Sequence, residues 1–443
     1  MDKHSDTASS RGSQAADAQQ PALTLRHVNA MPAPTWSWLQ MNETAIELPA
    51  SLARGSARLQ GSAVAVELAE GDDAVLTGAP DAFERALEKA GTRFRDRRPS
   101  APGDDRHAER IAAEDRLDVP AVSAYQRRAI EREERISPAE AFRTGMGGEA
   151  YAYLRDIAGA PVVIDVAENH RAQATVRIEG VDGAVTGGAI DVVARPSSRI
   201  AVTISLDSPA IGAGLVGLSL RVFAGARSQV SITCVQTLDD SWVALDDTGL
   251  FLDEDARVSV HHTVLGAGRS YTGLAGDLLG DLSNISVATD YLGTGEQRRD
   301  FNYELIQRGE KTVSELAANG VLAGQSAKTM RGTIELAHGC KGSRGSERET
   351  VLLADERVRN KTVPVILCDE DDVFGNHGAT IGHIRDEQLF YLATRGISPT
   401  AAEDLFIRAK LEDAVAGVAD KRIRAGVVRL SCALIDDFEE EIA

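Results

Sequence analysis

RIAVTISL (199–206), LSLRVFA (218–224) and QVSITCVQT (229–237) decide the fold, because apolar residues occupy alternate positions in each of these segments. Five further segments between residues 162 and 292 alternate in the same way: VVIDVA, ATVRIEGV, AIDVVA, RVSVHHTVL and ISVATDYL. Short turns such as GVDG and DEDA separate them. The run contains no long amphipathic helix, which excludes a doubly wound sheet, since that fold needs a crossover helix after each strand. A sandwich, a barrel and a solenoid of stacked strands all remain compatible with this spacing.

The regions on both sides of these strands differ in pattern. Residues 1–20 are rich in Ser, Gln and Ala and predict a disordered tail. Residues 21–150 predict a mixed, largely helical region, with a densely charged helix at 124–135. The strand region itself covers residues 151–384.

Residues 385–443 return to a helical pattern. A first helix is predicted to end at Gly396, and Ser398–Pro399 opens a second helix. Thr400 and Glu403 have the spacing of a capping box at the start of this second helix. A third helix precedes the acidic end of the sequence.

Charge and composition exclude several classes of function. The 443 residues carry a formal net charge of −19, which argues against nucleic acid as a partner, because phosphate binding needs clustered Lys and Arg. No apolar run is long enough to span a bilayer, and Met1–Gln20 has no hydrophobic stretch, so we expect a cytoplasmic protein without membrane contact. The four cysteines are scattered without a C-x-x-C pair and are expected to be reduced thiols.

Two nucleotide-binding motifs can be discounted. Gly212, Gly214 and Gly217 match G-x-G-x-x-G, but a strand follows the last glycine where the dinucleotide fingerprint requires a helix. The sequence contains no Gly-Lys dipeptide, and therefore no P-loop. H-E-x-x-H and G-x-S-x-G are also absent. We therefore expect a protein that is not itself an enzyme.

Several histidines and cysteines have structural explanations. Alternation in RVSVHHTV places His262 on the same face as the valines and His261 on the other face. His338 and Cys340 lie two apart in a segment that looks like a strand and could share a metal, but two ligands without a third are weak. Cys368 lies in PVILC and is expected to be buried as a small apolar residue.

His377 differs from the other histidines in its surroundings. It lies in GNHG, where Gly375 and Gly378 permit close backbone approach and expose the imidazole. It also lies where the strands give way to helices. From the residues alone, a turn histidine and a ligand are equally good interpretations.

Three segments carry a resemblance to a known family. NHGATIGHIRDEQLFYLATRGISPTAAEDL (Asn376–Leu405) resembles the C-terminal signature of the SufB/SufD family. FNYELIQRGEKTVSELAANGVLAGQSAKTMRGTIEL (Phe301–Leu336) resembles the run that precedes this signature. PTWSWLQMNET (Pro34–Thr44) is similar to pieces found in SufD-type members.

The resemblance implies a mainly β protein: a right-handed parallel β-helix flanked by helical N- and C-terminal regions. It implies a non-catalytic scaffold subunit of a complex that assembles iron–sulfur clusters. Members pair with one another through their β-helices, and each binds a SufC-like ATPase through its C-terminal helices. That docking region would include Phe390, Tyr391, Arg395 and Phe406. No cofactor would be bound stably by the chain alone, although the complex would hold a cluster transiently.

Residues that separate the two branches of the family favour SufD. Val358 stands about where SufB members have a cysteine, and His377–Thr380 reads His-Gly-Ala-Thr where they have His-Glu-Ala-Thr. Without that cysteine the chain lacks the soft thiolate ligand that a nascent cluster prefers. The sequence also departs from many SufD members, because Gly375 replaces the cysteine of a Cys-x-His and Gln307 replaces a frequent histidine. A cluster-ligand role at the SufB interface therefore depends mainly on His377.

Two alternatives stay open. The chain could be a SufB-like cluster carrier that uses His377 with Cys340 or Cys368. The β-helix also supports polysaccharide lyases and hydrolases, which are typically secreted, whereas no signal peptide is visible here. The partner at the β-helix could be a SufB-like subunit or a second copy of the chain.

Overall fold

The computed structural model describes most of the chain from residue 142 onward and shorter stretches before it. The described residues are 23–33, 39, 41–48, 52, 64–69, 74–75, 81–97, 142–383, 385–435 and 438. The tail predicted at 1–20 and the helix predicted at 124–135 lie outside them.

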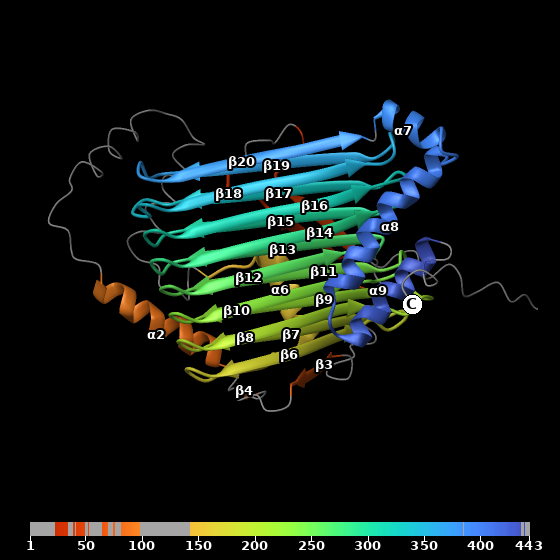
Figure 1. Cartoon of the computed structure of the whole chain (residues 1–443). Coiled ribbons are helices and arrows are strands. Elements are labelled where there is room, and N and C mark those ends of the chain that lie inside the picture. Colours follow the sequence, from red (N-terminus) through yellow and green to blue (C-terminus); the bar gives the residue numbers. More distant parts are fainter. Residues whose placement is uncertain are drawn as a thin grey trace, which may run out of the picture.

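A parallel β-solenoid of about eight turns spans residues 162–383 (Figure 1). Successive strands alternate between two facing sheets, and each strand pairs with strands two positions away in the chain. The even-numbered sheet contains β6 (Arg171–Glu179), β8 (Arg199–Asp207), β10 (Gln229–Gln236), β12 (Arg257–Val264), β14 (Asn284–Gly293), β16 (Val313–Leu322), β18 (Arg344–Leu353) and β20 (Phe374–His383). The odd-numbered sheet contains β5 (Val162–Val166), β7 (Val185–Ala194), β9 (Leu215–Ala224), β11 (Val243–Leu252), β13 (Arg269–Leu278), β15 (Arg298–Gln307), β17 (Ala327–Leu336) and β19 (Arg359–Cys368). The expected β-helix is confirmed, and its parallel pairing excludes the sandwich and the barrel.

The core is a continuous apolar stack inside the coil. Ile200, Val202 and Ile204 point inward from β8 and are almost completely buried, while Arg199 and Ala201 point outward. Each such buried aliphatic side chain stabilises the fold by roughly 1.5–3 kcal/mol. Alternation in the sequence therefore predicts correctly which residues form the core.

The turns repeat as regularly as the strands. Hydrogen-bonded side chains on successive turns lie 28 to 34 residues apart, as Ser231 with Ser259 and Lys328 with Thr362 show. The residue two positions before an even-numbered strand adopts a positive φ in several turns: Asn169, Ser197, Arg227, Asp255, Leu282, Lys311 and Gly342. A left-handed residue at this place reverses the chain direction, and most turns accept a non-glycine there at a cost of about 1 kcal/mol each.

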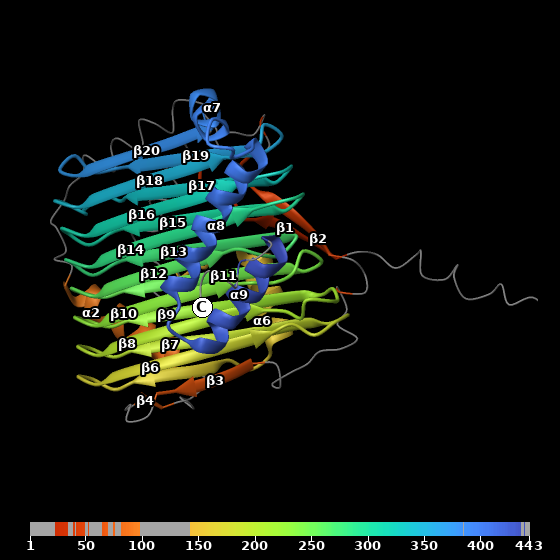
Figure 2. The same ribbon diagram turned by 45° about the vertical axis from the view of Figure 1, so that its right-hand side comes forward.

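The N-terminal elements cover the outer face of the odd-numbered sheet (Figure 2). They are the hairpin β1 (Leu23–Val28) and β2 (Thr44–Leu48), followed by α2 (Ala82–Arg97) and α6 (Gly148–Ala158). Because of this cover, every residue of β7, β9 and β11 is buried on both faces of the sheet.

Of the three C-terminal helices, the second and third lie against the other sheet, and the first packs on the second (Figure 1). They are α7 (Asp386–Ala393), α8 (Pro399–Gly417) and α9 (Lys421–Leu434). α8 and α9 cover an apolar patch that includes Val235, Leu265 and Leu292.

The expected capping box at Thr400 and Glu403 is wrong, because the hydroxyl of Ser398 accepts the capping hydrogen bond from the Ala401 amide at 3.1 Å. None of the described helices combines the length and apolar character needed to span a membrane.

The two ends of the solenoid differ. At the first turn, β3 (Val64–Leu68) and β4 (Ala74–Val75) pair antiparallel with β6 and β5 and cap the sheets. At the last turn, β19 and β20 end the two sheets, and nearly every residue of β20 is exposed.

We expect Gly320→Ala to destabilise the solenoid, because a Cβ at this position would lie 2.0 Å from two ring carbons of the buried Tyr291. Forcing the ring aside should lower the free energy of unfolding by about 1–3 kcal/mol. Gly378→Ala is the matched control, because nothing lies within 4 Å of its Cβ position. Chemical denaturation of the three proteins tests this, and equal stability of the two variants would contradict the packing seen at Tyr291.

Candidate functional site

The open end of the solenoid combines three features in the described structure: unpaired backbone groups of a terminal strand, a histidine, and buried charged side chains. β20 pairs with β18 on one side and has no described strand on its other side. Its free backbone groups can accept another strand, which is how sheet edges recruit partners.

His377 lies in an inward-facing column at this end. The register aligns Val287, Leu316, Glu347 and His377 on successive even-numbered strands. Because residues paired in a parallel ladder point to the same side, His377 follows the buried Glu347 on the inner side of the coil. The column thus changes from apolar to ionisable over its last two turns.

A buried ion pair lies one turn below β20, where Glu349 is aligned with Ala379 of β20. The Lys328 ammonium bonds the Glu349 carboxylate, and both side chains are about 1% exposed. Lys328 also donates to the Thr362 hydroxyl at 3.0 Å, and the Tyr291 hydroxyl donates to Glu349 at 3.1 Å. Burial lowers the pKa of Lys328, although the Glu349 carboxylate opposes this effect.

Glu347 lies in the neighbouring inner column, and one of its carboxyl oxygens, like one of Glu349, has no hydrogen-bond partner among the described atoms. Burial first, and then repulsion from Glu349, raise its pKa to about 8. The Glu347 side chain is therefore protonated and neutral at neutral pH, and could accept or release a proton near the open end.

A second polar group lies deeper in the coil. The Cys234 thiol donates to Asp246 at 3.3 Å, His262 lies 3.7 Å from Asp246, and the His262 ring is 3.2 Å from the Tyr303 hydroxyl. Burial lowers the pKa of His262 and raises those of Asp246 and Cys234. Cys234 is therefore held as a thiol, which is a poor metal ligand. His262 is buried and His261 faces outward, as the alternation predicts.

The remaining candidate ligands do not form a metal centre. His338 and Cys340 lie in the turn after β17, so the expected strand there is wrong. Burial raises the pKa of Cys340 to about 11. Cys368 is exposed, contrary to expectation, because β19 is the terminal strand of its sheet and no further described strand pairs with it. Within the described part of the chain, no group of three or more His, Cys, Asp or Glu is arranged to hold a metal ion.

The C-terminal helices carry a separate exposed patch. Phe390 and Tyr391 on α7 are 73% and 55% exposed, and the Arg395 guanidinium stacks on the Tyr391 ring at 3.8 Å. Leu405 on α8 is also exposed, whereas Phe406 is half-buried. Large apolar side chains exposed together on neighbouring helices are typical of a docking surface.

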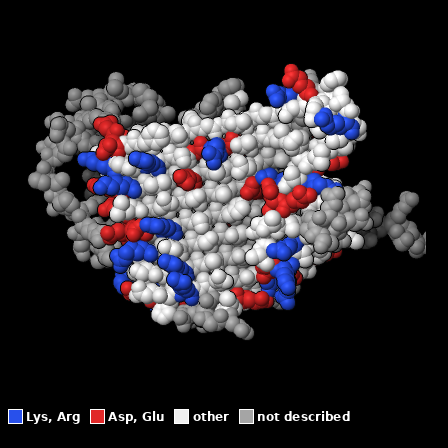
Figure 3. All heavy atoms as spheres, viewed as in Figure 1, with Lys and Arg blue, Asp and Glu red and all other residues white. Residues whose placement is uncertain are grey.

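Charges on the even-numbered sheet are distributed unevenly (Figure 3). Its centre shows few charges, and Lys and Arg gather along the margin where the strands begin. Arg171, Arg199, Arg257 and Arg344, each the first residue of its strand, belong to this margin.

Comparison with known protein families identifies the family of this chain. Residues 176–410, more than half of the chain, match the SufBD core domain of the SUF system for iron–sulfur cluster assembly. The chain belongs to the SufB/SufD family.

Individual members of the SufB/SufD family align over shorter stretches. SufD of Bacillus subtilis is 26% identical over 188 residues, which is 42% of this chain and 43% of that protein. SufD of Escherichia coli is 24% identical over 216 residues, 47% of this chain and 51% of that protein. A SufBD family protein of Mycobacterium leprae is 32% identical over 128 residues, 29% of this chain and 14% of that protein. The chain thus spans about half the length, or less, of these relatives.

The candidate site residues predicted from the sequence lie in two different places in the structure. His377 lies at the open end, while Phe390, Tyr391 and Arg395 lie together on and after α7. Gln307, which replaces the family's frequent histidine, is buried and donates to the Thr312 hydroxyl at 3.0 Å.

Sequence reasoning missed Lys328, Glu347 and Glu349. The sequence held a signal for Lys328, because Lys328 and Met330 are two apart in a strand and therefore share its inner face.

We expect the stability of the protein to fall as pH rises from about 4.5 to about 8, in part because of Glu347. Its raised pKa in the folded state means that folding favours the protonated form, and this contribution is lost as pH rises through the folded pKa. Glu347→Gln should therefore be more stable than the wild type at alkaline pH, by on the order of a few kcal/mol, and similar to it at acid pH.

Urea denaturation at both ends of this pH range is the measurement. Glu315→Gln, an exposed substitution on the neighbouring strand β16, is the control. An equal gain at acid and alkaline pH would show that the change at Glu347 acts through packing and not through its proton.

Proposed function

We propose that the chain is a SufD-like scaffold subunit of a SUF complex and does not itself catalyse a reaction. The observation that carries this proposal is the open end of the solenoid, where a free strand edge and His377 lie above a buried set of charges. A partner that adds its own terminal strands would cover both the edge and the histidine. The partner proposed here is a SufB-like subunit, with a second copy of this chain as the other occupant to be tested.

His377 is proposed to contribute to a nascent iron–sulfur cluster at that junction. An imidazole nitrogen is a suitable iron ligand, and within the described chain no group of three or more His, Cys, Asp or Glu is arranged around it to hold a metal. The remaining ligands would therefore come from the partner. The cluster is cargo of the complex and not a resident cofactor of this subunit.

A SufB-like carrier role is less well supported. It would need a thiolate beside His377, but Cys340 is buried with its pKa raised to about 11. Cys368 is exposed at the last residue of β19, and its thiol lies 3.3 Å from the Glu370 carbonyl oxygen. Normal cluster assembly by a Cys368→Ser complex would eliminate this alternative.

The exposed patch on α7 and α8 is proposed to dock a SufC-like ATPase. ATP hydrolysis would then belong to that partner, since this chain has no Gly-Lys dipeptide and hence no P-loop. The subunit would transmit the movement of the ATPase to the junction, because α8 is tied to the solenoid by the Lys410–Asp290 ion pair at 2.6 Å.

Replacing both Phe390 and Tyr391 by Ala should weaken co-purification with the SufC-like ATPase at least tenfold, because exposed aromatic anchors dominate such interfaces. Point variants are preferable to deletion of the helices, which would uncover the apolar patch beneath α8 and α9. Ile211→Ala, at an 88% exposed position in a distant loop, is the control. Undiminished binding by the double variant would remove the patch from the proposal.

His377→Ala should reduce the cluster formed by the complex with the SufB-like subunit, while leaving the melting temperature of the free subunit within about 1–2 °C. The reason is that β20 is exposed, so the imidazole contributes little to the stability of the free chain. Anaerobic reconstitution with iron and sulfide, followed by absorbance, measures the cluster. His383→Ala, at the far end of the same strand, is the control, and a normal cluster yield from His377→Ala would defeat the ligand role.

A further inference from the structure

A groove runs along the edge where chain segments turn from the even-numbered into the odd-numbered sheet. It has a volume of about 590 Å³, and its lining includes Arg269, Arg298, Arg359 and Gln325. A smaller depression of about 260 Å³ continues it, shares Arg298 and Arg359, and is also lined by Lys361. The groove lies on the opposite side of the coil from the basic margin of the even-numbered sheet, and is separate from α7.

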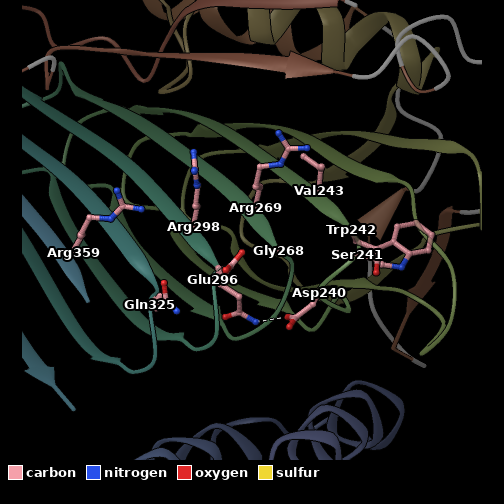
Figure 4. Close-up of a pocket in the computed structure, with 11 residues that line it drawn as sticks. Asp240, Ser241, Trp242, Val243, Gly268, Arg269, Glu296, Arg298, Gln325 and Arg359 are labelled. Atoms are coloured by element: carbon pink, nitrogen blue, oxygen red, sulfur yellow. Dashed lines mark hydrogen bonds between the residues drawn. The ribbon is translucent and has the colours of Figure 1, made fainter. Parts of the chain in front are cut away.

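Three arginines form a row along this groove. The ladder aligns Arg269 with Arg298, Arg298 with Ala327, and Ala327 with Arg359. Neighbouring strands lie about 4.8 Å apart, so the row extends over roughly 14 Å, with a small residue at its third place. The three side chains project to the same side of the sheet (Figure 4).

The row lacks counter-charges of its own. Among the described residues, no carboxylate lies within ion-pair distance of Arg269, Arg298 or Arg359. The nearby Asp300 is already paired with Arg331 at 2.7 Å and accepts a hydrogen bond from Asn29.

Two other acids line the groove. Asp240 accepts a hydrogen bond from Gln297, and Glu296 is exposed. On a chain with a net charge of −19, three aligned guanidinium groups without acidic partners form a local site for anions.

A free strand edge lies beside the row. Thr44 and Ala45 of β2 line the depression together with Arg298 and Arg359. β2 pairs with β1 and with no other described strand. The hairpin packs on α6 and runs obliquely across successive turns to the depression, as the row does (Figure 2).

We propose that this groove binds an extended acidic peptide segment of a partner protein, which pairs its backbone with β2 and places its carboxylates on Arg269, Arg298 and Arg359. Strand addition supplies the backbone hydrogen bonds, and each guanidinium can hold a carboxylate through two parallel hydrogen bonds. The long arginine side chains span the difference between the spacing of strands and that of alternate peptide residues.

The features of a nucleotide site are missing from the described lining. Trp242 is 1% exposed and Tyr271 is 8% exposed, so neither offers a free ring for stacking a base. No helix begins at the groove to receive a phosphate. Free anions that lack a backbone would use the arginines and leave the edge of β2 unpaired.

The test uses the full chain and a fluorescent peptide of alternating Glu and Val, followed by anisotropy at low salt. Replacing both Arg298 and Arg359 by Ala should weaken binding by about tenfold or more, since two charge-assisted contacts are lost. The matched control replaces Arg171 and Arg199, two exposed strand-initial arginines of the other sheet, by Ala and should change binding less than about twofold. Circular dichroism and melting confirm that both variants fold.

Two further probes separate strand pairing from simple anion binding. A peptide methylated at alternate backbone nitrogens should bind about tenfold more weakly, because it cannot donate to β2. Tripolyphosphate should compete only weakly. Equal binding by the methylated peptide, or unchanged binding by the Arg298/Arg359 double variant, would overturn the proposal.

Discussion

In-register parallel pairing is the constraint on which the rest of this protein depends. Each turn of the solenoid donates its backbone hydrogen bonds to the turns above and below, and side chains at equivalent places form columns along the axis. A column can hold apolar residues, glycines or hydrogen-bonded polar groups. Its side chains have little space to move, as the close approach of Tyr291 to Gly320 shows. A turn is therefore stable only through its neighbours, which is the general property of solenoids.

The same constraint lets one inner column change its chemistry over the last two turns. Inner columns that are apolar through Val287 and Leu316 become ionisable at Glu347 and His377. Buried charge is costly, and the structure meets this cost by pairing Lys328 with Glu349 and by holding Glu347 protonated. Such residues would be a liability in an isolated chain, but they suit a surface that a second subunit completes. The proposed junction with a partner subunit is therefore placed where the inner columns end in ionisable side chains.

The outer faces of the two sheets differ because different segments of the chain cover them. The N-terminal hairpin and helices bury the odd-numbered sheet, and α8 and α9 bury part of the even-numbered one. Uncovered strips remain along the edges of this cover, and the arginine row beside β2 is one of them. If the acidic-peptide proposal holds, the family scaffold would have a contact surface away from both the open end and the α7 patch.

Sequence alone determined the run of short strands, their inward residues and the helical C-terminal region, because alternation and turn residues are local signals. It did not separate a solenoid from a sandwich or a barrel by pattern, and only the family resemblance implied the stacked strands. It also determined the family, through the segment around His377, and the opposite orientations of His261 and His262. Tertiary structure decided that Cys368 is exposed, that Ser398 caps α8, and that Lys328 and Glu349 pair. It also aligned Arg269, Arg298 and Arg359, which lie far apart in the sequence. These outcomes depend on which strands become neighbours in the stack and on where the stack ends. No local sequence pattern specifies either, because the register between two strands depends on the lengths of all the segments that connect them.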